Sequence, residues 1–256
     1  MAYKIHLMRG RNGEDLASNN NLTAIVVDAL RASSTLTAIL SSFPKDVRVI
    51  SNLKDCYTLQ NEIEDTVLIG EQNNFPPEGF LFGNSPIDIL ANKNKIEGKS
   101  VVFITSNGAK RLISSLGKKN DVYMGCISTR NMVAKAVANL EGDIVITSAG
   151  AYGDESFISI EDDITSCIIA KTIMNETGEK YEISSKSDID YIKTTELLTW
   201  TTAADIFTNS SHGQKLISQG FGKDISFCAD FNEINVLPKV IEYVTLNEKV
   251  VGVLVA

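Results

Sequence analysis

The sequence predicts an α/β fold in which a mostly parallel or mixed sheet is flanked by helices in three layers. Short runs of apolar, often β-branched residues recur along the chain. Each run is followed by a small polar turn and then by apolar residues at helical spacing, as expected for alternating strands and helices. Such alternation builds sheets covered by helices on both faces. We expect one unit over residues 1–256; two similar α/β halves with a boundary near residues 125–131 remain the alternative.

The predicted elements follow one another regularly. A weakly alternating strand precedes residues 9–21, which are interpreted as a loop because they are polar and contain Gly10 and Gly13. Residues 180–195 are also interpreted as a loop or insertion. The predicted strands are residues 3–8, 25–27, 47–51, 66–70, 100–104, 121–125, 143–147, 225–229 and 250–255. The predicted helices are residues 36–40, 53–64, 87–91, 109–116, 133–140, 164–174 and, in two parts broken near 210–213, residues 197–220.

One long connection, residues 72–86, contains three of the five prolines and three phenylalanines. A long ordered loop inside a compact domain is more often functional than not. The phenylalanines are expected to anchor it to the body of the protein, since a disordered linker would leave them in water. We therefore predict an ordered, functional loop here.

Composition limits the class of protein. The net charge is −8 and no basic run is present, which argues against nucleic acid as a partner. No apolar run is long enough to cross a membrane and the N-terminus is unlike a signal peptide, so a cytoplasmic location is expected. The four cysteines lack CxxC spacing and are predicted to be buried free thiols; with only two histidines, a zinc site is not expected. A homo-oligomer remains open.

Polar residues gather in the turns that follow the predicted strands, which is where open α/β sheets bind ligands. Carboxylates with hydroxyl and amide groups suit a hard cation such as Mg²⁺. An arginine and hydroxyl groups at a helix start suit an anion. For each turn alone, the alternative is an ordinary helix cap with a surface arginine. The polar residues of these turns are Asp28, Arg31, Ser33, Ser34, Thr35, Glu71, Thr105, Ser106, Asn107, Ser128, Thr129, Ser148, Glu161, Asp162 and Asp163.

Several common catalytic motifs are missing from the sequence. There is no Walker A sequence, no GxGxxG after a strand and no GxSxG elbow. The D-x-D pattern of haloacid-dehalogenase-type phosphatases is also missing, because Leu30 stands where its second aspartate would be.

Residues 28–35, Asp-Ala-Leu-Arg-Ala-Ser-Ser-Thr, resemble the V-D-x-L-R-A-[ST]-[ST]-T segment of the 2-phosphosulfolactate phosphatase family. Further short segments similar to those of the family follow in the same order, and together they cover residues 22 to about 240. Leu81 departs from the family pattern, which usually has aspartate there. The further segments are residues 70–71, 79–86, 105–108, 148–150, 161–163 and 213–228.

The resemblance implies a phosphoric monoester hydrolase that uses Mg²⁺ to convert 2-phospho-3-sulfolactate to 3-sulfolactate and phosphate, a step toward coenzyme M in methanogens. A phosphatase of another small phosphorylated acid and a non-catalytic binder of a small anionic acid are the alternatives. The nucleophile would be a metal-bound water or Asp28 itself.

The site residues assigned on this interpretation fall into three groups. The catalytic group is Asp28, Arg31 and Glu71. The metal ligands are Asp28, Glu71, Glu161, Asp162 and Asp163. The substrate-binding group is Arg31, Ser33, Ser34, Thr35, Asn84, Ser85, Thr105, Ser106 and Asn107.

Overall fold

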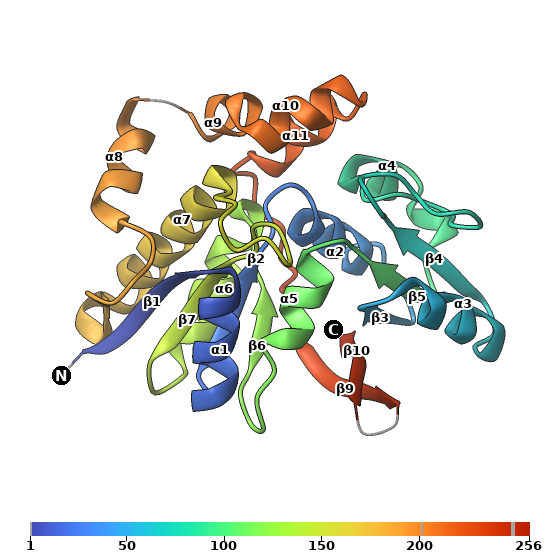
Figure 1. Cartoon of the computed structure of the whole chain (residues 1–256), viewed down its shortest axis with the longest axis horizontal. Helices are drawn as coiled ribbons and strands as arrows, with labels where there is room; N and C mark the ends of the chain where they lie inside the picture. Colours follow the sequence, from blue (N-terminus) through green and yellow to red (C-terminus); the bar gives the residue numbers. More distant parts are fainter. Residues whose placement is uncertain (1, 201, 247–248) are drawn as a thin grey trace.

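The computed structural model describes residues 2–200, 202–246 and 249–256. Within them, the strands form two five-stranded sheets with helices packed against both (Figure 1). The first sheet has the order β6-β2-β7-β1-β8 and is parallel throughout. Its strands are β1 (Tyr3–Arg9), β2 (Thr23–Val27), β6 (Val122–Met124), β7 (Ile144–Ser148) and β8 (Tyr181–Ile183). The predicted α/β class is confirmed.

The second sheet is mixed and has the order β4-β5-β3-β10-β9. β3, β4 and β5 are parallel, whereas β10 is antiparallel to both β3 and β9. Each sheet takes strands from both sides of residues 125–131, and a domain boundary there stays a prediction. The strands are β3 (Asp46–Ile50), β4 (Thr66–Gly70), β5 (Ser100–Ile104), β9 (Val240–Leu246) and β10 (Lys249–Val255).

Helices α1 (Gly10–Asn20), α2 (Ala32–Leu40) and α5 (Gly108–Ser114) share one hydrophobic core with the facing sides of both sheets, and Ile89 of α4 (Pro86–Ala91) joins this core. The opposite face of the first sheet packs against α6 (Arg130–Ala138) and α7 (Ile160–Thr177). The outer face of the second sheet packs against α3 (Leu53–Glu62). Side chains of β2 alternate between the two cores of the first sheet: Ile25 belongs to one and Val26 to the other.

Of the remaining helices, α8 (Tyr191–Trp200) packs against α7, and the others lie at the end of the sheets where the parallel strands finish. α4 (Pro86–Ala91) packs against α2 and α11, and α9, α10 and α11 lie along the upper edge of the view in Figure 1. In the described residues, no helix is both long and apolar enough to span a bilayer. The bounds of the four C-terminal helices are α8 (Tyr191–Trp200), α9 (Ala203–Asn209), α10 (Ser211–Ser218) and α11 (Gly222–Cys228).

The predicted loop at residues 9–21 is wrong, because α1 occupies this segment. Its buried side is formed by small residues and one paired glutamate rather than by large apolar residues, so the usual periodic signal is missing. Gly13 is required by close packing, since a Cβ atom there would lie 2.3 Å from Thr147 Oγ1 of β7. Asn21, in the left-handed conformation, ends the helix.

The predicted strand at residues 225–229 is also wrong. Its β-branched and aromatic residues, Ile225 and Phe227, lie in α11, which buries Asp224, Ile225 and Cys228 at helical spacing. The segment 180–195 contains β8 and the beginning of α8, which the sequence did not indicate. β9 was not predicted either.

The loop at residues 72–86 is anchored by its phenylalanines as expected. Phe75 packs on the ring of Phe221 and Phe80 on that of Tyr57, with ring centroids 5.8 and 6.1 Å apart. Phe82 packs against the core between the sheets. The four cysteines are buried free thiols, as predicted.

Candidate active site

The carboxyl ends of strands from both sheets meet at one cleft. β2 ends directly before Asp28 and β4 directly before Glu71, and their neighbours β7 and β5 end in register with them. The turns after these strands, the loop at residues 72–86 and α10 enclose a cavity of about 410 Å³. This is the position at which α/β sheets bind ligands. The polar residues that line it are Asp28, Asn73, Asn74, Ser106, Asn107, Ser159, Asp162, Ser211, His212 and Lys215.

Asp28 lies at the floor of this cleft and is 7% exposed. Its carboxylate accepts hydrogen bonds from the backbone N–H groups of Ala32 (3.3 Å) and Gly108 (2.9 Å), which fix its orientation. Burial raises the pKa of Asp28, and the nearby charge of Glu71 adds to this, although His212 and the two N–H donors oppose it. A cation in the cleft would favour the charged form.

Asp162, in the first turn of α7, is the second carboxyl of the floor. It accepts hydrogen bonds from the backbone N–H groups of Ala29 (2.7 Å) and Gly150 (3.0 Å), and so connects the turns after β2 and β7. The pKa of Asp162 is raised well above its ordinary value by burial, and then by the charges of Asp28 and Glu161. The floor therefore brings two carboxyls together, and among the described residues no arginine lines the cleft beside them.

Glu161 points to α10. His212 Nδ1 lies 3.5 Å from Glu161 Oε1, and the glutamate side chain is 2% exposed. Burial alone would raise the pKa of Glu161, but the contact with His212 and hydrogen-bond donors from the backbone and Ser159 lower it. In the described part of the chain, Oε1 accepts no hydrogen bond. Glu161 thus ties α7 to a histidine that lines the cleft.

Glu71 connects the second sheet to the cleft. Its Oε1 accepts a hydrogen bond from the Ser106 N–H (2.6 Å), and its Oε2 accepts from the Asn74 N–H (2.7 Å) and the Ser106 hydroxyl (3.0 Å). Its oxygens are therefore bonded within the protein, and they position Ser106 and Asn74 at the wall of the cleft.

Asp163 faces away from the cleft. Its carboxylate forms a two-pronged ion pair with Arg9, whose Nη2 lies 2.6 Å from Oδ2, and accepts a hydrogen bond from Ser148 (2.7 Å). Three consecutive acids at the start of α7 thus point to three different neighbours, because successive helix positions are rotated by about 100°.

Arg31 does not line the cleft. Its guanidinium is buried, with Nη1 2.6 Å from Asp224 Oδ2, Nη2 3.3 Å from the Asn74 carbonyl oxygen, and its plane above the Phe221 ring. Ser85 donates to the other oxygen of Asp224 at 2.7 Å. Arg31 and Ser85 therefore hold α11 and the loop at residues 72–86 together, and a direct role of Arg31 toward substrate stays a prediction.

The other predicted side chains divide between the cleft and the interior. Ser106 and Asn107 line the cleft. Ser33 Oγ accepts a hydrogen bond from the Asp28 N–H, and Thr105 Oγ1 accepts from the Ala109 N–H. These two hydroxyls shape the turns rather than face the cavity. Residues buried behind it are Ser33, Ser34, Thr35, Asn84, Ser85 and Thr105.

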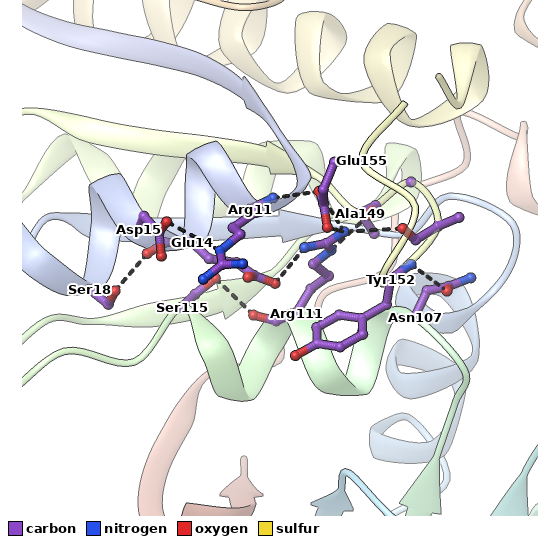
Figure 2. A network of polar contacts seen from close by, with 12 residues as sticks. Arg11, Glu14, Asp15, Ser18, Asn107, Arg111, Ser115, Ala149, Tyr152 and Glu155 are labelled. Carbon is purple, nitrogen blue, oxygen red and sulfur yellow. Dashed lines mark hydrogen bonds and ion pairs between the residues drawn. The ribbon is translucent and has the colours of Figure 1, made fainter. Parts of the chain in front are cut away.

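Arg111 is the centre of a network of polar contacts that includes the loop after β7, as Figure 2 shows. Its Nε donates to the carbonyl oxygen of Ala149 (2.9 Å), its Nη1 to Glu14 (2.8 Å) and its Nη2 to Glu155 (2.9 Å). Asn107 Oδ1 also accepts from the Tyr152 N–H at 2.9 Å. The loop after β7 is therefore fastened to the α5 region at several points.

The five predicted metal ligands are not gathered at one point. Among residues 2–200, 202–246 and 249–256, no three or more His, Cys, Asp or Glu side chains form an arrangement that could hold a metal ion by themselves. Mg²⁺ needs only one or two carboxylates and keeps several waters. The two buried carboxyls at the floor, Asp28 and Asp162, fit this requirement, and their raised pKa values fit a site that a cation would stabilise.

Sequence reasoning missed the cleft residues on α10, His212 and Lys215, and the asparagines Asn73 and Asn74. His212 is one of two histidines in the chain and directly precedes the segment, beginning at Gly213, that resembles the family pattern. No local pattern indicates that α10 returns to the ends of strands more than 60 residues earlier in the sequence.

An α/β protein with a polar cleft at its strand ends and two buried carboxyls in that cleft has the architecture of a small-ligand enzyme site. A family model described as 2-phosphosulpholactate phosphatase matches residues 11–242. The chain belongs to this family of phosphoric monoester hydrolases.

Similar proteins carry the same description. The chain is 34% identical over 217 residues to the 2-phosphosulfolactate phosphatase of Methanocaldococcus jannaschii. The aligned region spans 83% of this chain and 86% of the relative. It is 30% identical over 230 residues to a probable 2-phosphosulfolactate phosphatase of Caldanaerobacter subterraneus (89% and 90%). A probable 2-phosphosulfolactate phosphatase of Carboxydothermus hydrogenoformans is 27% identical over 226 residues (88% and 89%).

Proposed function

We propose that this protein is a Mg²⁺-dependent phosphatase that hydrolyses 2-phospho-3-sulfolactate to 3-sulfolactate and phosphate. The observation that carries the proposal is the pair of buried carboxyls, Asp28 and Asp162, at the floor of the cleft in a chain of this family. The name of the Methanocaldococcus relative supports the choice of substrate. Coenzyme M biosynthesis is the pathway that this substrate implies.

Asp28 and Asp162 would hold the ion. When bound, Mg²⁺ supplies positive charge to the phosphoryl oxygens and lowers the pKa of a coordinated water. The protein supplies orientation: backbone N–H groups fix both carboxylates, and Ser106 and Asn107 offer polar contacts on the wall. In the overall reaction, a water oxygen bonds to phosphorus, the bond from phosphorus to the ester oxygen breaks, and that oxygen takes a proton to become the product hydroxyl.

The oxygen atom that attacks phosphorus belongs either to a water molecule or to the carboxylate of Asp28. Both oxygens of Asp28 accept backbone N–H groups, which supports a holding role and favours water. The alternative is attack by Asp28 to form a phospho-aspartate. Trapping of a phosphorylated protein modified at Asp28 would decide for the second route.

Release of inorganic phosphate from 2-phospho-3-sulfolactate, compared with a panel of other small phosphorylated acids, tests the proposal. We expect the highest kcat/KM for the sulfonated substrate. A higher value for another phospho-acid would keep the phosphatase and change its substrate. If the protein bound these esters but released phosphate from none of them, it would be a non-catalytic binder of small anions.

We also propose that the protein is cytoplasmic and does not bind nucleic acid. The four buried free thiols suit a reducing compartment, and the net charge of −8 disfavours a polyanion as partner. Whether the chain forms a homo-oligomer stays a prediction for a solution measurement.

A further inference from the structure

The negative charge around the cleft opposes binding of the anionic substrate that the proposed reaction requires. The floor of the cleft carries two carboxyls, Asp28 and Asp162, and the protein as a whole carries a charge of −8. A substrate with several anionic groups gains nothing from this field and needs local cations. A metal ion on the floor would serve the phosphate but would leave the other anionic groups without a partner.

The arginines do not supply these cations. In the described chain, no arginine side chain lines the cleft. The guanidiniums near it are already paired, since Arg31 pairs with Asp224, Arg9 with Asp163, and Arg111 with Glu14 and Glu155. Their positive charge is paired with these carboxylates, and the ion pairs hold the walls of the cleft.

The basic side chains that line the cleft lie on α10. His212 and Lys215 are three residues apart, which places them on the same side of the helix. Leu216, next to Lys215 in the sequence, is buried and packs α10 against the protein, and the helix begins at Ser210, whose Oγ accepts a hydrogen bond from the Gly213 N–H at 2.9 Å. The helix therefore presents both basic groups to the cavity.

The two side chains differ in how they are held. His212 Nδ1 lies 3.5 Å from the buried Glu161, which orients the imidazole and leaves Nε2 as its other polar atom. Lys215 is exposed and, within the described residues, forms no ion pair or side-chain hydrogen bond. Its ammonium is thus available to a ligand without the loss of an existing contact.

We propose that Lys215 and His212 form a second anion subsite, which binds the carboxylate or sulfonate of a substrate whose phosphate lies at the carboxylate floor. This proposal rests on the proposed function, because it takes the floor as the phosphate side. It makes the two residues specificity determinants: they select phosphate esters that carry an additional acidic group on a short carbon skeleton.

Paired substrates test this role directly. 2-Phosphoglycolate carries a carboxylate and ethyl phosphate does not, while both are small phosphate monoesters. For Lys215→Met we expect KM for 2-phosphoglycolate to rise about tenfold with little change in kcat, and KM for ethyl phosphate to stay within about twofold. His212→Gln should act in the same direction, and Lys215→Arg should restore most of the affinity.

Lys54→Met serves as the matched control, because Lys54 is an exposed lysine on α3, which packs on the outer face of the second sheet. An equal effect of Lys215→Met on both esters, or no effect on either, would overturn the proposal. If the wild-type protein releases phosphate from neither ester nor from 2-phospho-3-sulfolactate, the proposed function fails. Calorimetric binding of the same two compounds then carries the test: loss of the preference for 2-phosphoglycolate in Lys215→Met supports the subsite, and an unchanged preference contradicts it.

Discussion

Arg31 and Asp224 form a buried ion pair of 2.6 Å between residues 193 positions apart in the sequence. Arg31 belongs to the turn after β2, and Asp224 to α11. The pair therefore connects the floor of the cleft to the C-terminal helices that cover it. Ser85 donates to the same aspartate and brings the loop at residues 72–86 into the connection.

Breaking this pair is expected to destabilise the protein strongly. Arg31→Met or Asp224→Asn leaves a buried charge or polar group without its partner, which costs about 3–5 kcal/mol in the free energy of unfolding. Urea denaturation of each variant measures the loss. The double variant Arg31→Met/Asp224→Asn should lose less than the sum of the two single losses.

Arg11→Met is the control, since that side chain is 74% exposed and should change the unfolding free energy by less than about 1 kcal/mol. Additive losses in the double variant would mean that Arg31 and Asp224 do not act as a pair.

Gly108 is expected to be sensitive to the smallest substitution. Its N–H donates to Asp28, and a Cβ atom at this position would lie 2.7 Å from Asp28 Oδ2. Gly108→Ala should displace the carboxylate and lower kcat/KM about a hundredfold. Gly222→Ala, whose new methyl group would meet Ile217 at 3.7 Å, is the control. Full activity of the Gly108→Ala protein would contradict the assignment of Asp28 to the active site.

The ion pair between Arg111 and Glu155 predicts a pH dependence of stability. Burial, the largest single contribution, raises the pKa of Glu155, but the Arg11 N–H and the Arg111 guanidinium together lower it below its ordinary value. A carboxyl whose pKa is lower in the folded than in the unfolded protein stabilises the fold above its unfolded pKa. That contribution disappears as the pH falls through the folded pKa.

The destabilisation caused by Glu155→Gln should thus be largest near pH 6 and shrink below about pH 4.5. Urea titrations of both proteins from pH 3 to 7 measure it. Since Glu155 is partly exposed, the effect should be small. If the loss of unfolding free energy caused by Glu155→Gln grew toward acid pH, it would contradict a lowered pKa of Glu155 in the folded protein.

The cysteines are expected to be unreactive in the native protein. Burial raises the pKa of Cys56 and of Cys167 to about 12, and raises that of Cys228 as well. At pH 8 only about 1 in 10,000 of a thiol with such a pKa is thiolate, the reactive form. A disulfide reagent should therefore modify these residues within minutes only after unfolding in guanidinium. Fast modification of the native protein at Cys56 or Cys167 would contradict the described burial.

Regular strand–turn–helix alternation made most of the fold predictable. β2, β4, β5 and β7 are buried on both faces, so their sequences are continuous apolar runs that end at polar turns. The division of these strands between two sheets was not predictable, because buried parallel strands in either sheet have the same pattern. α1 was missed because its packing depends on glycine and on the paired Glu14, not on large apolar side chains.

The candidate site was predictable to the level of its turns but not of its side chains. The strand-end rule located Asp28, Ser106 and Asn107 at the cleft. It could not separate Asp162, which faces the cleft, from Asp163, which pairs with Arg9, because that depends on helix rotation against distant neighbours. His212 and Lys215 reach the cleft through tertiary packing of α10, which leaves no signal in the local sequence.

The most direct test of the central claim is phosphate release from 2-phospho-3-sulfolactate, with and without Mg²⁺, in the wild-type protein, Asp28→Asn and Asp162→Asn. Asp88→Asn, an exposed aspartate on α4, is the control. We predict release that requires Mg²⁺, falls at least a hundredfold in the two floor variants and persists in the control. Release that is unaffected by a chelator and by both substitutions would contradict the assignment of Asp28 and Asp162 as the metal-binding floor of the site.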